Sequence, residues 1–479
     1  MQANGSSRCI KMKDILCVAL ICSLFAMGVQ PGFAIARPAL KTHAQLLSTL
    51  LSTSSSTSTA RFIVRDTAGL AGLNLTCLLL GCNVLQGIGD PDGQLFVVQS
   101  AGLLNPVIFL KRLLSASGVV DAEPDQTVNT LGATMGTIPS YLTDEKLIYY
   151  YGAKVWEGYV IQTPNQIVRT AQTQSDFDVT GLGITVALID TGVDTKNKVL
   201  RSHLVDGYDF TRNSANGGSE IGDITQSTAG VIDGSTQPAQ LNQSTAGVID
   251  ESRAQVINQP QYSAFGHGTM TAGIVHLVAP NAGLMPLKAF NANGTGYASD
   301  VLRAIYYAVD HDAKVISMSF DFTSPSLELA KAINYATTST VICVASAGND
   351  GSMTVVYPAG LPNVIDVAST SNTNTPSTFS NYGTPPVWIS APGEAVMSTY
   401  PFGTYAVGWG TSFSAPFVSG TVALMASASF QSSTLLNQAT AANAVSHAQP
   451  IPESQYGFGV LDTYQAVQAW KTSLDQNPF

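Results

Sequence analysis

Three side chains that lie far apart in the chain have the types needed for acyl transfer. Ser412 stands in Gly410-Thr411-Ser412-Phe413-Ser414, and the small and apolar run that follows is typical of a buried helix. A serine at a helix N-terminus lies among unpaired backbone N–H groups, which stabilise the oxyanion formed when its hydroxyl attacks a carbonyl. Pro416, one turn further on, breaks the rule against proline inside helices, and such exceptions concentrate at functional sites. A helix cap is nevertheless the commoner role for a lone serine of this kind.

The partners that a nucleophilic serine needs are also present. Asp190 ends the apolar strand predicted for 184–190, and reactive groups gather at the carboxyl ends of strands in parallel sheets. His267 lies between two glycines at the start of an apolar helix predicted for 267–278. Serine becomes a nucleophile when a histidine takes its proton and a carboxylate orients the imidazole. Each residue alone could be a turn former or a cap, but together they predict an Asp-His-Ser triad.

A fourth segment supplies a donor for the oxyanion. Asn349 lies in Ala345-Ser346-Ala347-Gly348-Asn349, directly after the strand predicted for 340–345. A side-chain amide at the end of a strand can donate to the developing negative charge on a substrate oxygen. Asn349 is therefore the predicted oxyanion residue.

These four segments, in this order, closely resemble those of the subtilisin-like serine proteases, the subtilases. The matching motifs are DTG at Asp190, HGT at His267, AGN at Asn349 and GTSxSAP at Ser412. The resemblance covers about residues 150–470. It implies a three-layer αβα fold with a mostly parallel sheet. It also implies a serine endopeptidase that works through an acyl-enzyme, is made as a self-processing zymogen and needs no cofactor.

The resemblance also implies a peptide-binding cleft. Its predicted lining comes from two segments that end strands: Ser317, Met318, Ser319, Phe320 and Asp321, and Ala345, Ser346, Ala347 and Gly348. Most of these residues are small or apolar, which suggests a broad preference for substrates with an apolar residue at the cleaved bond. Asp321 stands where the family usually has glycine, and we expect it to favour a basic residue further along the peptide.

Two more departures from the family pattern concern the helices. Phe413 replaces a usual methionine beside the nucleophile, an apolar exchange that should be tolerated. The helix after His267 runs directly into Val278-Ala279-Pro280-Asn281, without the calcium-binding loop that some relatives insert there. We therefore expect no calcium at this position, and no metal site is predicted elsewhere.

The elements that must position these groups form a domain predicted for 149–470. Apolar strands alternate with helices, which indicates a parallel sheet covered on both faces. The further predicted strands are 283–289 and 315–320, and the further helices are 299–308 and 327–337. A polar insertion at 211–258 contains the octapeptide QSTAGVID twice, at 226–233 and 243–250. It is predicted to be a surface loop, with a hairpin of the two copies as the less favoured alternative. Residues 471–479 are predicted to be a tail.

A smaller domain is predicted for residues 61–125. Strands at 61–65, 95–99 and 119–120 alternate with helices at 70–85 and 106–115, so the expected order is β-α-β-α-β, a small α+β domain. It resembles the inhibitory propeptide of the family, which acts as a chaperone and tethered inhibitor. Residues 37–60 and 126–148 are interpreted as linkers, and maturation is expected to occur within 122–150.

The first 36 residues are interpreted as an export signal. Arg8, Lys11 and Lys13 precede a short apolar stretch, and Ala34-Ile35-Ala36 matches a cleavage site. An uncleaved anchor is the alternative, but the stretch is short for a membrane span. Three of the six cysteines lie in this segment; Cys77 and Cys82 could pair after export, and Cys343 is expected in the core. The protein is therefore expected to be secreted or periplasmic.

Composition limits the partners. The chain has 479 residues, a net charge of −10 and no basic run, which argues against nucleic acid. The expected partners are protein or peptide substrates and the chain's own propeptide, with no membrane after signal removal and a monomeric state. The rival interpretations are a catalytically silent binding protein with the subtilase fold and an esterase. The second is disfavoured because the residues around Ser412 do not match G-x-S-x-G.

Overall fold

The computed structural model describes residues 59–129, 137–215, 217–223, 246–248, 262–383, 387–429, 435–451 and 456–476. The predicted export signal and most of the linker at 37–60 lie outside the described residues. The chain divides into the units Met1–Ala36 and Arg37–Phe479, and the elements below all belong to the second unit.

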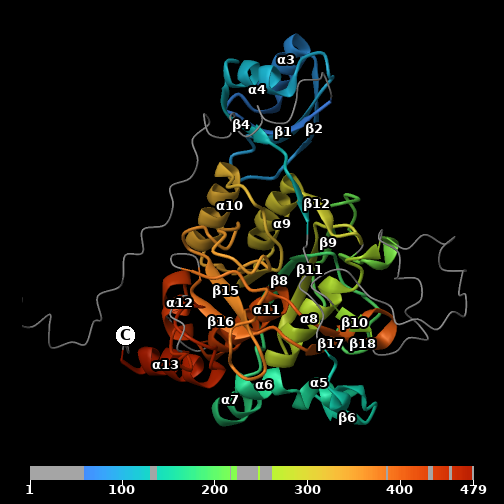
Figure 1. The fold of residues 1–479 in the computed structure, drawn as a ribbon. Coiled ribbons are helices and arrows are strands. Elements are labelled where there is room, and N and C mark those ends of the chain that lie inside the picture. Colours follow the sequence, from blue (N-terminus) through green and yellow to red (C-terminus); the bar gives the residue numbers. More distant parts are fainter. Residues whose placement is uncertain are drawn as a thin grey trace, which may run out of the picture. The chain divides into compact units, whose positions relative to one another are not determined.

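Residues 61–124 form a four-stranded antiparallel sheet, in the order β2-β3-β1-β4, with two helices (Figure 1). The elements are β1 (Arg61–Asp66), α3 (Gly69–Leu80), β2 (Cys82–Gly87), β3 (Leu95–Ser100), α4 (Pro106–Leu114) and β4 (Val119–Pro124). The order is thus β-α-β-β-α-β, and the prediction of β-α-β-α-β was wrong. The helix predicted to reach residue 85 ends at Leu80 because Gly81 adopts a left-handed conformation, with φ of 70°.

Apolar side chains from this sheet and its helices form their own core. Phe62 and Val64 of β1 pack with Leu73, Phe109 and Leu113 of the helices, and all are buried. A disulfide between Cys77 and Cys82 joins the last turn of α3 to the start of β2. The pairing that the sequence allowed is therefore formed.

A seven-stranded parallel sheet, in the order β16-β15-β14-β13-β8-β11-β9, forms the centre of the larger domain (Figure 1). Its strands are β8 (Thr185–Asp190), β9 (Tyr208–Asp209), β11 (Gly283–Lys288), β13 (Val315–Met318), β14 (Ile342–Ser346), β15 (Ile365–Thr370) and β16 (Ile389–Pro392). The parallel sheet predicted from the apolar strand runs is confirmed.

Helices cover both faces of this sheet, and strand β8 shows how. Val186 and Leu188 belong to the core cluster that contains α8 (His267–Val278) and α11 (Thr411–Ala428). Ala187 and Ile189 point to the opposite face and belong to the cluster with α9 (Ala298–Asp310) and α10 (Leu327–Thr338). Because successive side chains of a strand alternate between faces, one apolar run supplies both cores. The three-layer αβα fold is confirmed.

Shorter elements complete the described chain. They are β5 (Thr127–Asn129), η1 (Ser140–Thr143), β6 (Leu147–Tyr150), β7 (Ala153–Trp156), α5 (Glu157–Ile161), α6 (Thr163–Ile167), α7 (Thr170–Phe177), η2 (Ile221–Asp223), β10 (Ala246–Val248), β12 (Thr295–Tyr297), β17 (Val396–Tyr400), η6 (Pro401–Gly403), β18 (Thr404–Gly408), α12 (Gln438–Val445) and α13 (Thr463–Gln476). Helix α13 continues through the first part of the predicted tail. No helix within the described ranges is long and apolar enough to cross a membrane.

The polar insertion is not entirely a loop. Ala246–Val248, inside the second copy of QSTAGVID, form strand β10, which pairs antiparallel with β18 in a sheet of order β10-β18-β17. The prediction of a surface loop was wrong for these three residues, because their backbone completes a sheet edge. The first copy lies outside the described residues, so the hairpin alternative is not tested.

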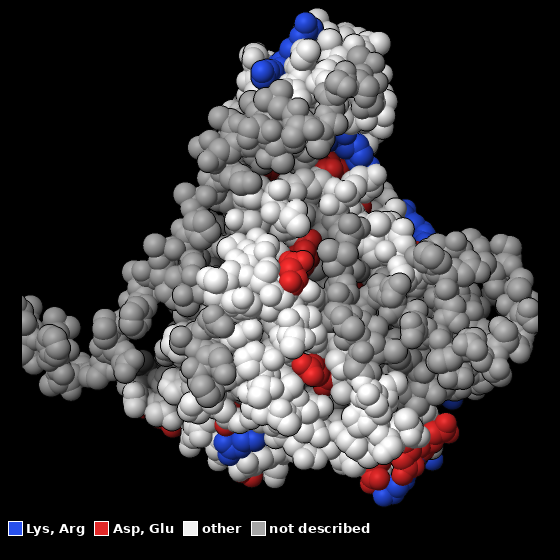
Figure 2. All heavy atoms as spheres, viewed as in Figure 1, with Lys and Arg blue, Asp and Glu red and all other residues white. Residues whose placement is uncertain are grey.

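Charged side chains are sparse on the surface. On the face shown in Figure 2, Lys, Arg, Asp and Glu of the described residues lie in small separate groups. This distribution follows from a composition with only 11% charged residues.

Candidate active site

Asp190 and His267 meet at the carboxyl end of the parallel sheet. Asp190 is the last residue of β8, and His267 is the first residue of α8. The Nδ1 atom of His267 lies 2.7 Å from the Oδ1 atom of Asp190, and both side chains are buried. The carboxylate also accepts hydrogen bonds from the Thr191 N–H at 2.7 Å and the Thr271 hydroxyl at 3.1 Å. Three contacts therefore hold the carboxylate against one nitrogen of the imidazole.

Ser412 is the second residue of helix α11, where the sequence placed it. Gly410, the N-cap, has a φ of 149°, a conformation that favours glycine over residues with a side chain. The ring of Phe413 lies 5.7 Å from the ring of His267, so the first turn of α11 lies beside the imidazole. All three predicted catalytic residues thus lie on elements that meet at the carboxyl end of the parallel strands.

The hydroxyl of Ser412 does not bond to His267 in this structure. It donates to the backbone carbonyl of Ser319 at 3.3 Å, and the Nε2 atom of His267 has no hydrogen-bond partner among the described residues. Hydrogen bonds between catalytic groups are often absent or long before substrate binds. In this structure the acceptor for the Ser412 hydroxyl therefore comes from the predicted cleft segment 317–321.

A second hydrogen bond joins Ser319 to Ser412, and the position of Pro416 explains it. A proline has no N–H, so the carbonyl four residues earlier, that of Ser412, lacks its helical hydrogen bond. The Ser319 hydroxyl donates to this carbonyl at 3.0 Å. The hydroxyl of Ser319 thus bonds to the carbonyl of Ser412, and the carbonyl of Ser319 accepts from the hydroxyl of Ser412, which ties the start of α11 to the end of β13.

Asn349 is anchored to the first residue of α11. Its Oδ1 atom accepts the Thr411 N–H at 2.9 Å and the Thr411 hydroxyl at 3.0 Å. With the amide oxygen held in this way, the donors of the amide are on the Nδ2 atom, on the other side of the group. The Gly348 N–H also donates to the Thr411 hydroxyl, at 3.2 Å.

The predicted cleft residues divide into two groups. The side chains of Met318, Phe320 and Ala345 are buried in the core on the α9 and α10 face of the sheet. Ser317 is also buried and accepts a hydrogen bond from the Ser419 hydroxyl at 2.9 Å. These residues can present only backbone to a peptide.

The second group lies at or just after the carboxyl ends of β13 and β14. Ser346, Ala347 and Gly348 are buried at the end of β14 and directly after it. Asp321 is partly exposed; burial, together with the Asp350 carboxylate, raises the pKa of Asp321 to about 7.

Sequence reasoning missed residues that support the site from behind. Thr271 holds the Asp190 carboxylate, as described above, and Lys288 is fully buried at the end of β11, opposite Asp190 in the sheet register. A single lysine at the end of the apolar segment Gly283–Lys288 is a detectable signal, because lysine is almost never fully buried without a partner.

Comparisons with known proteins found relatives of this chain. A sequence model described as the subtilase family matches residues 181–459. Thermitase from Thermoactinomyces vulgaris is 33% identical over 257 residues, which cover 52% of this chain and 76% of thermitase. Subtilisin Savinase from Lederbergia lenta is 38% identical over 169 residues, which cover 33% of this chain and 62% of that protein.

A solved structure shares the fold. Fervidolysin from Fervidobacterium pennivorans, described as a keratinolytic enzyme related to subtilisin, aligns with a TM-score of 0.64 and 20% sequence identity. The alignment covers 87% of this chain and 62% of the fervidolysin chain. At this identity the likeness concerns the fold alone.

Proposed function

The chain belongs to the subtilase family of subtilisin-like serine endopeptidases, and we propose that Asp190, His267 and Ser412 are its catalytic triad. The contact between His267 Nδ1 and Asp190 at 2.7 Å carries this proposal. It leaves Nε2, which has no partner among the described residues, as the nitrogen that accepts the Ser412 proton.

The reaction follows from these positions. Ser412 Oγ attacks the peptide carbonyl while His267 takes its proton, and Asp190 stabilises the imidazolium that forms. The Asn349 amide and the Ser412 N–H donate to the oxyanion. His267 then gives the proton to the leaving amine, which breaks the peptide bond and leaves an acyl-enzyme. Water, activated by the same histidine, releases the acid and restores the serine.

Ser412→Ala tests the nucleophile. We expect casein hydrolysis to fall by a factor of about 10⁴ or more, because the acyl-enzyme can no longer form. Self-processing and labelling by a fluorophosphonate should also be lost. Ser414→Ala is the matched control, since Ser414 is buried two residues away and its hydroxyl has no partner among the described residues. If the parent protein is folded and processed but does not react with the probe, the silent binding protein becomes the better interpretation.

Proteins or peptides are the proposed substrates. An extended peptide would pair with the backbone that follows β13 and β14, the predicted cleft segments 317–321 and 345–348. The buried side chains of these segments are consistent with recognition through the main chain. Asp321 is the one acidic side chain among them, and we propose that it selects a basic residue of the substrate.

The domain at 61–125 is proposed to be a tethered inhibitor and folding chaperone. Support comes from two of its carboxylates, each at the N-terminus of a peptidase helix. Glu123 accepts from the Ser326 hydroxyl and from the Leu327 N–H at 3.1 Å, at the start of α10. Asp125 accepts from the N–H and the hydroxyl of Ser299, both at 2.9 Å, in the first turn of α9. Side-chain oxygens that accept hydrogen bonds from the first backbone N–H groups of a helix stabilise it at these positions.

Two further contacts join this domain to the peptidase. Arg65 of β1 forms an ion pair with Glu328 of α10 at 2.7 Å. Strand β5, directly after the domain, pairs antiparallel with β12 over Thr127–Asn129. A segment that adds to a peptidase strand before cleavage is what an intramolecular inhibitor requires.

Export and maturation are proposed from the N-terminal sequence. The disulfide Cys77–Cys82 supports export, since disulfides persist mainly in oxidising compartments. N-terminal sequencing of protein recovered outside the cytoplasm should find a first residue within 122–150. An intact residue 1 on active protein would contradict both proposals. Gel filtration of the same sample tests the proposed monomer.

A further inference from the structure

Glu220 is a fully buried carboxyl that reaches the helix bearing His267. Its Oε2 atom accepts the N–H of Gly266 at 2.7 Å, and its Oε1 atom accepts the hydroxyl of Thr269. Gly266 is the N-cap of α8 and has no capping side chain of its own. Glu220 therefore accepts, from another segment, one of the backbone N–H groups at the start of this helix and a side-chain hydroxyl of its first turn, on the two sides of His267.

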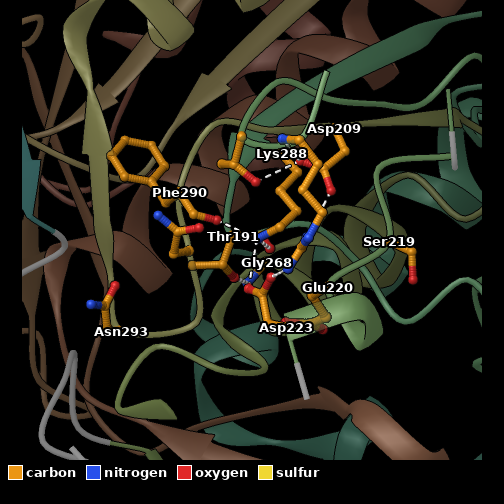
Figure 3. Close-up of polar contacts among 12 residues, drawn as sticks. Thr191, Asp209, Ser219, Glu220, Asp223, Gly268, Lys288, Phe290 and Asn293 are labelled. Carbon is orange, nitrogen blue, oxygen red and sulfur yellow. Dashed lines mark hydrogen bonds and ion pairs between the residues drawn. The ribbon is translucent and has the colours of Figure 1, made fainter. Parts of the chain in front are cut away.

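Lys288 holds the backbone next to Asp190. Its Nζ atom donates to the carbonyl of Thr191 at 2.9 Å and to the carbonyl of Phe290. Thr191 is the central residue of this arrangement. Its N–H donates to Asp190, and its hydroxyl accepts the N–H of Gly268, in the first turn of α8, at 3.0 Å. Figure 3 shows Lys288, Thr191 and Gly268 in this cluster.

One short segment connects the two buried groups. Asp223 lies three residues after Glu220 and accepts from Lys288 Nζ at 2.8 Å. Arg212 forms ion pairs with Asp223 and with Asp209, the second at 2.8 Å. The segment 217–223 also pairs with the turn after Asp190, through the Val193 N–H to the Gly218 carbonyl at 2.9 Å. A part of the polar insertion thus lies directly behind the catalytic pair.

We propose that Glu220 and Lys288 are positioning residues that set the geometry of His267 against Asp190 for proton transfer. The inference rests on the triad proposed above. Burying a carboxyl and an ammonium is costly unless each is fully hydrogen-bonded, so their presence here needs a reason beyond stability. A displacement of a catalytic group by about 1 Å can lower the rate about 100-fold. Holding His267 and Asp190 in position is therefore a role that explains why these two groups are buried here.

The protonation state of Glu220 decides which variant is conservative. Burial raises the pKa of Glu220 to about 8, opposed by the hydrogen bonds from Thr269 and Gly266 and by Lys288, while Asp194 adds to the increase. The side chain is therefore protonated up to a higher pH than an exposed glutamate, and the protonated acid is the form that a conservative variant has to match. Glutamine matches this form in shape, and its amide oxygen can still accept the Gly266 N–H.

The test compares Glu220→Leu with Glu220→Gln in the matured enzyme. We expect Glu220→Leu to lower kcat and the rate of fluorophosphonate labelling together, by about 10- to 100-fold, with KM within about twofold. Glu220→Gln should restore both rates to within about threefold of the parent, because it keeps the contact to Gly266. Labelling reports on His267, since the probe reacts only with an activated serine.

Gln174→Leu is the matched control for a merely structural role. Gln174 is buried and donates to the Leu277 and Val278 carbonyls at 3.2 and 2.9 Å, at the far end of the same helix. Its loss should lower the thermal midpoint without a selective loss of kcat.

Failure of this inference is distinguishable from failure of the proposed function. A parent enzyme that is labelled at Ser412 upholds the triad, whatever the Glu220 variants do. If folded Glu220→Leu is labelled at the parent rate, or if Glu220→Gln loses as much as Glu220→Leu, the positioning role is wrong. If Glu220→Leu does not fold, Lys288→Met is judged by the same split between kcat and KM, and an unchanged kcat overturns the inference.

Discussion

At the residue scale, the side-chain amide of Asn349 binds the start of α11 through its oxygen and is the proposed oxyanion donor through its nitrogen. Its oxygen accepts two hydrogen bonds from Thr411, the first residue of α11, and its two donors are therefore on the Nδ2 atom. The proposed oxyanion donor is thus held by the same helix that carries the proposed nucleophile, Ser412. Preorganised donors of this kind cost no rearrangement when charge develops on the substrate oxygen.

Asn349→Ala should lower kcat by about 10²–10³, a magnitude known from a subtilisin, which is a member of this same family, and KM should change little. Thr411→Val is the control, because it removes one contact to the amide oxygen but keeps the donor nitrogen; its effect should stay below about tenfold. Steady-state kinetics on a chromogenic peptide measure both. An Asn349→Ala enzyme with parental kcat would remove the residue from the oxyanion site.

Asp321 should make substrate preference depend on pH. Because burial raises its pKa to about 7, the side chain is neutral below that pH and charged above it. The preference for a basic residue over an uncharged one of similar length should therefore grow as the pH rises from about 6 to 8. Ratios of kcat/KM for paired lysine and norleucine peptides measure it. Asp321→Asn should give a ratio that does not change with pH, and a parent ratio that is equally constant would refute the assignment.

At the element scale, helix α11 contains a proline whose missing hydrogen bond is replaced by the residue that follows strand β13. Pro416 removes one donor from the helix, and the hydroxyl of Ser319 replaces it at the Ser412 carbonyl. The two elements are therefore joined at the nucleophile by a hydrogen bond that an ordinary helix would make internally.

A double mutant can test this compensation. Ser319→Ala should lower the free energy of unfolding by about 1–3 kcal/mol, since it leaves the buried Ser412 carbonyl without its donor. Adding Pro416→Ala should recover part of the loss, because the introduced alanine has a backbone N–H that can bond to that carbonyl. Urea unfolding of the uncleaved Ser412→Ala chain, with the other substitutions added to it, gives the energies without self-digestion. Strictly additive effects of the two substitutions would contradict the argument.

The sequence was sufficient for elements with a strong local pattern and insufficient for those that depend on distant partners. The apolar runs correctly predicted the strands β8 and β14. The start of the apolar helix α8 at His267 was also predicted correctly. Strand β2 was missed because Cys82–Gly87 continues the apolar composition of helix α3, and only the conformation of Gly81 separates the two. Glu220 was missed because it lies in a polar insertion, and its partners in α8 are more than 40 residues away.

At the scale of the whole molecule, the two domains are joined through groups whose charge can change. Burial raises the pKa of Glu123 to about 8, although the Ser326 hydroxyl and the Leu327 N–H oppose the shift. A group whose pKa is higher in the docked state stabilises docking at low pH, and this contribution is lost as the pH rises through the docked value. The contacts at α10 should therefore weaken as the pH rises toward 8.

Hydrogen exchange in the uncleaved Ser412→Ala chain measures this effect. After correction for intrinsic rates, protection in the first turn of α10 should fall about 10- to 100-fold between pH 6 and pH 9. Glu123→Gln should remove most of this fall, because the amide does not titrate. Asp92→Asn, at an exposed carboxylate of the same domain, is the control. An equal fall in the Glu123→Gln and parent chains would show that other groups govern the docking.

The octapeptide that contains strand β10 occurs twice in the chain. Ala246–Val248 pair with β18, and β18 leads within a few residues to the nucleophile. The three-residue sequence Ala-Gly-Val also occurs at 229–231, within an identical run of eight. The local sequence therefore does not distinguish the three residues that form β10 from their copy. A deletion that removed one copy would therefore leave the chain with the same tripeptide that pairs here with β18, which ends four residues before Ser412.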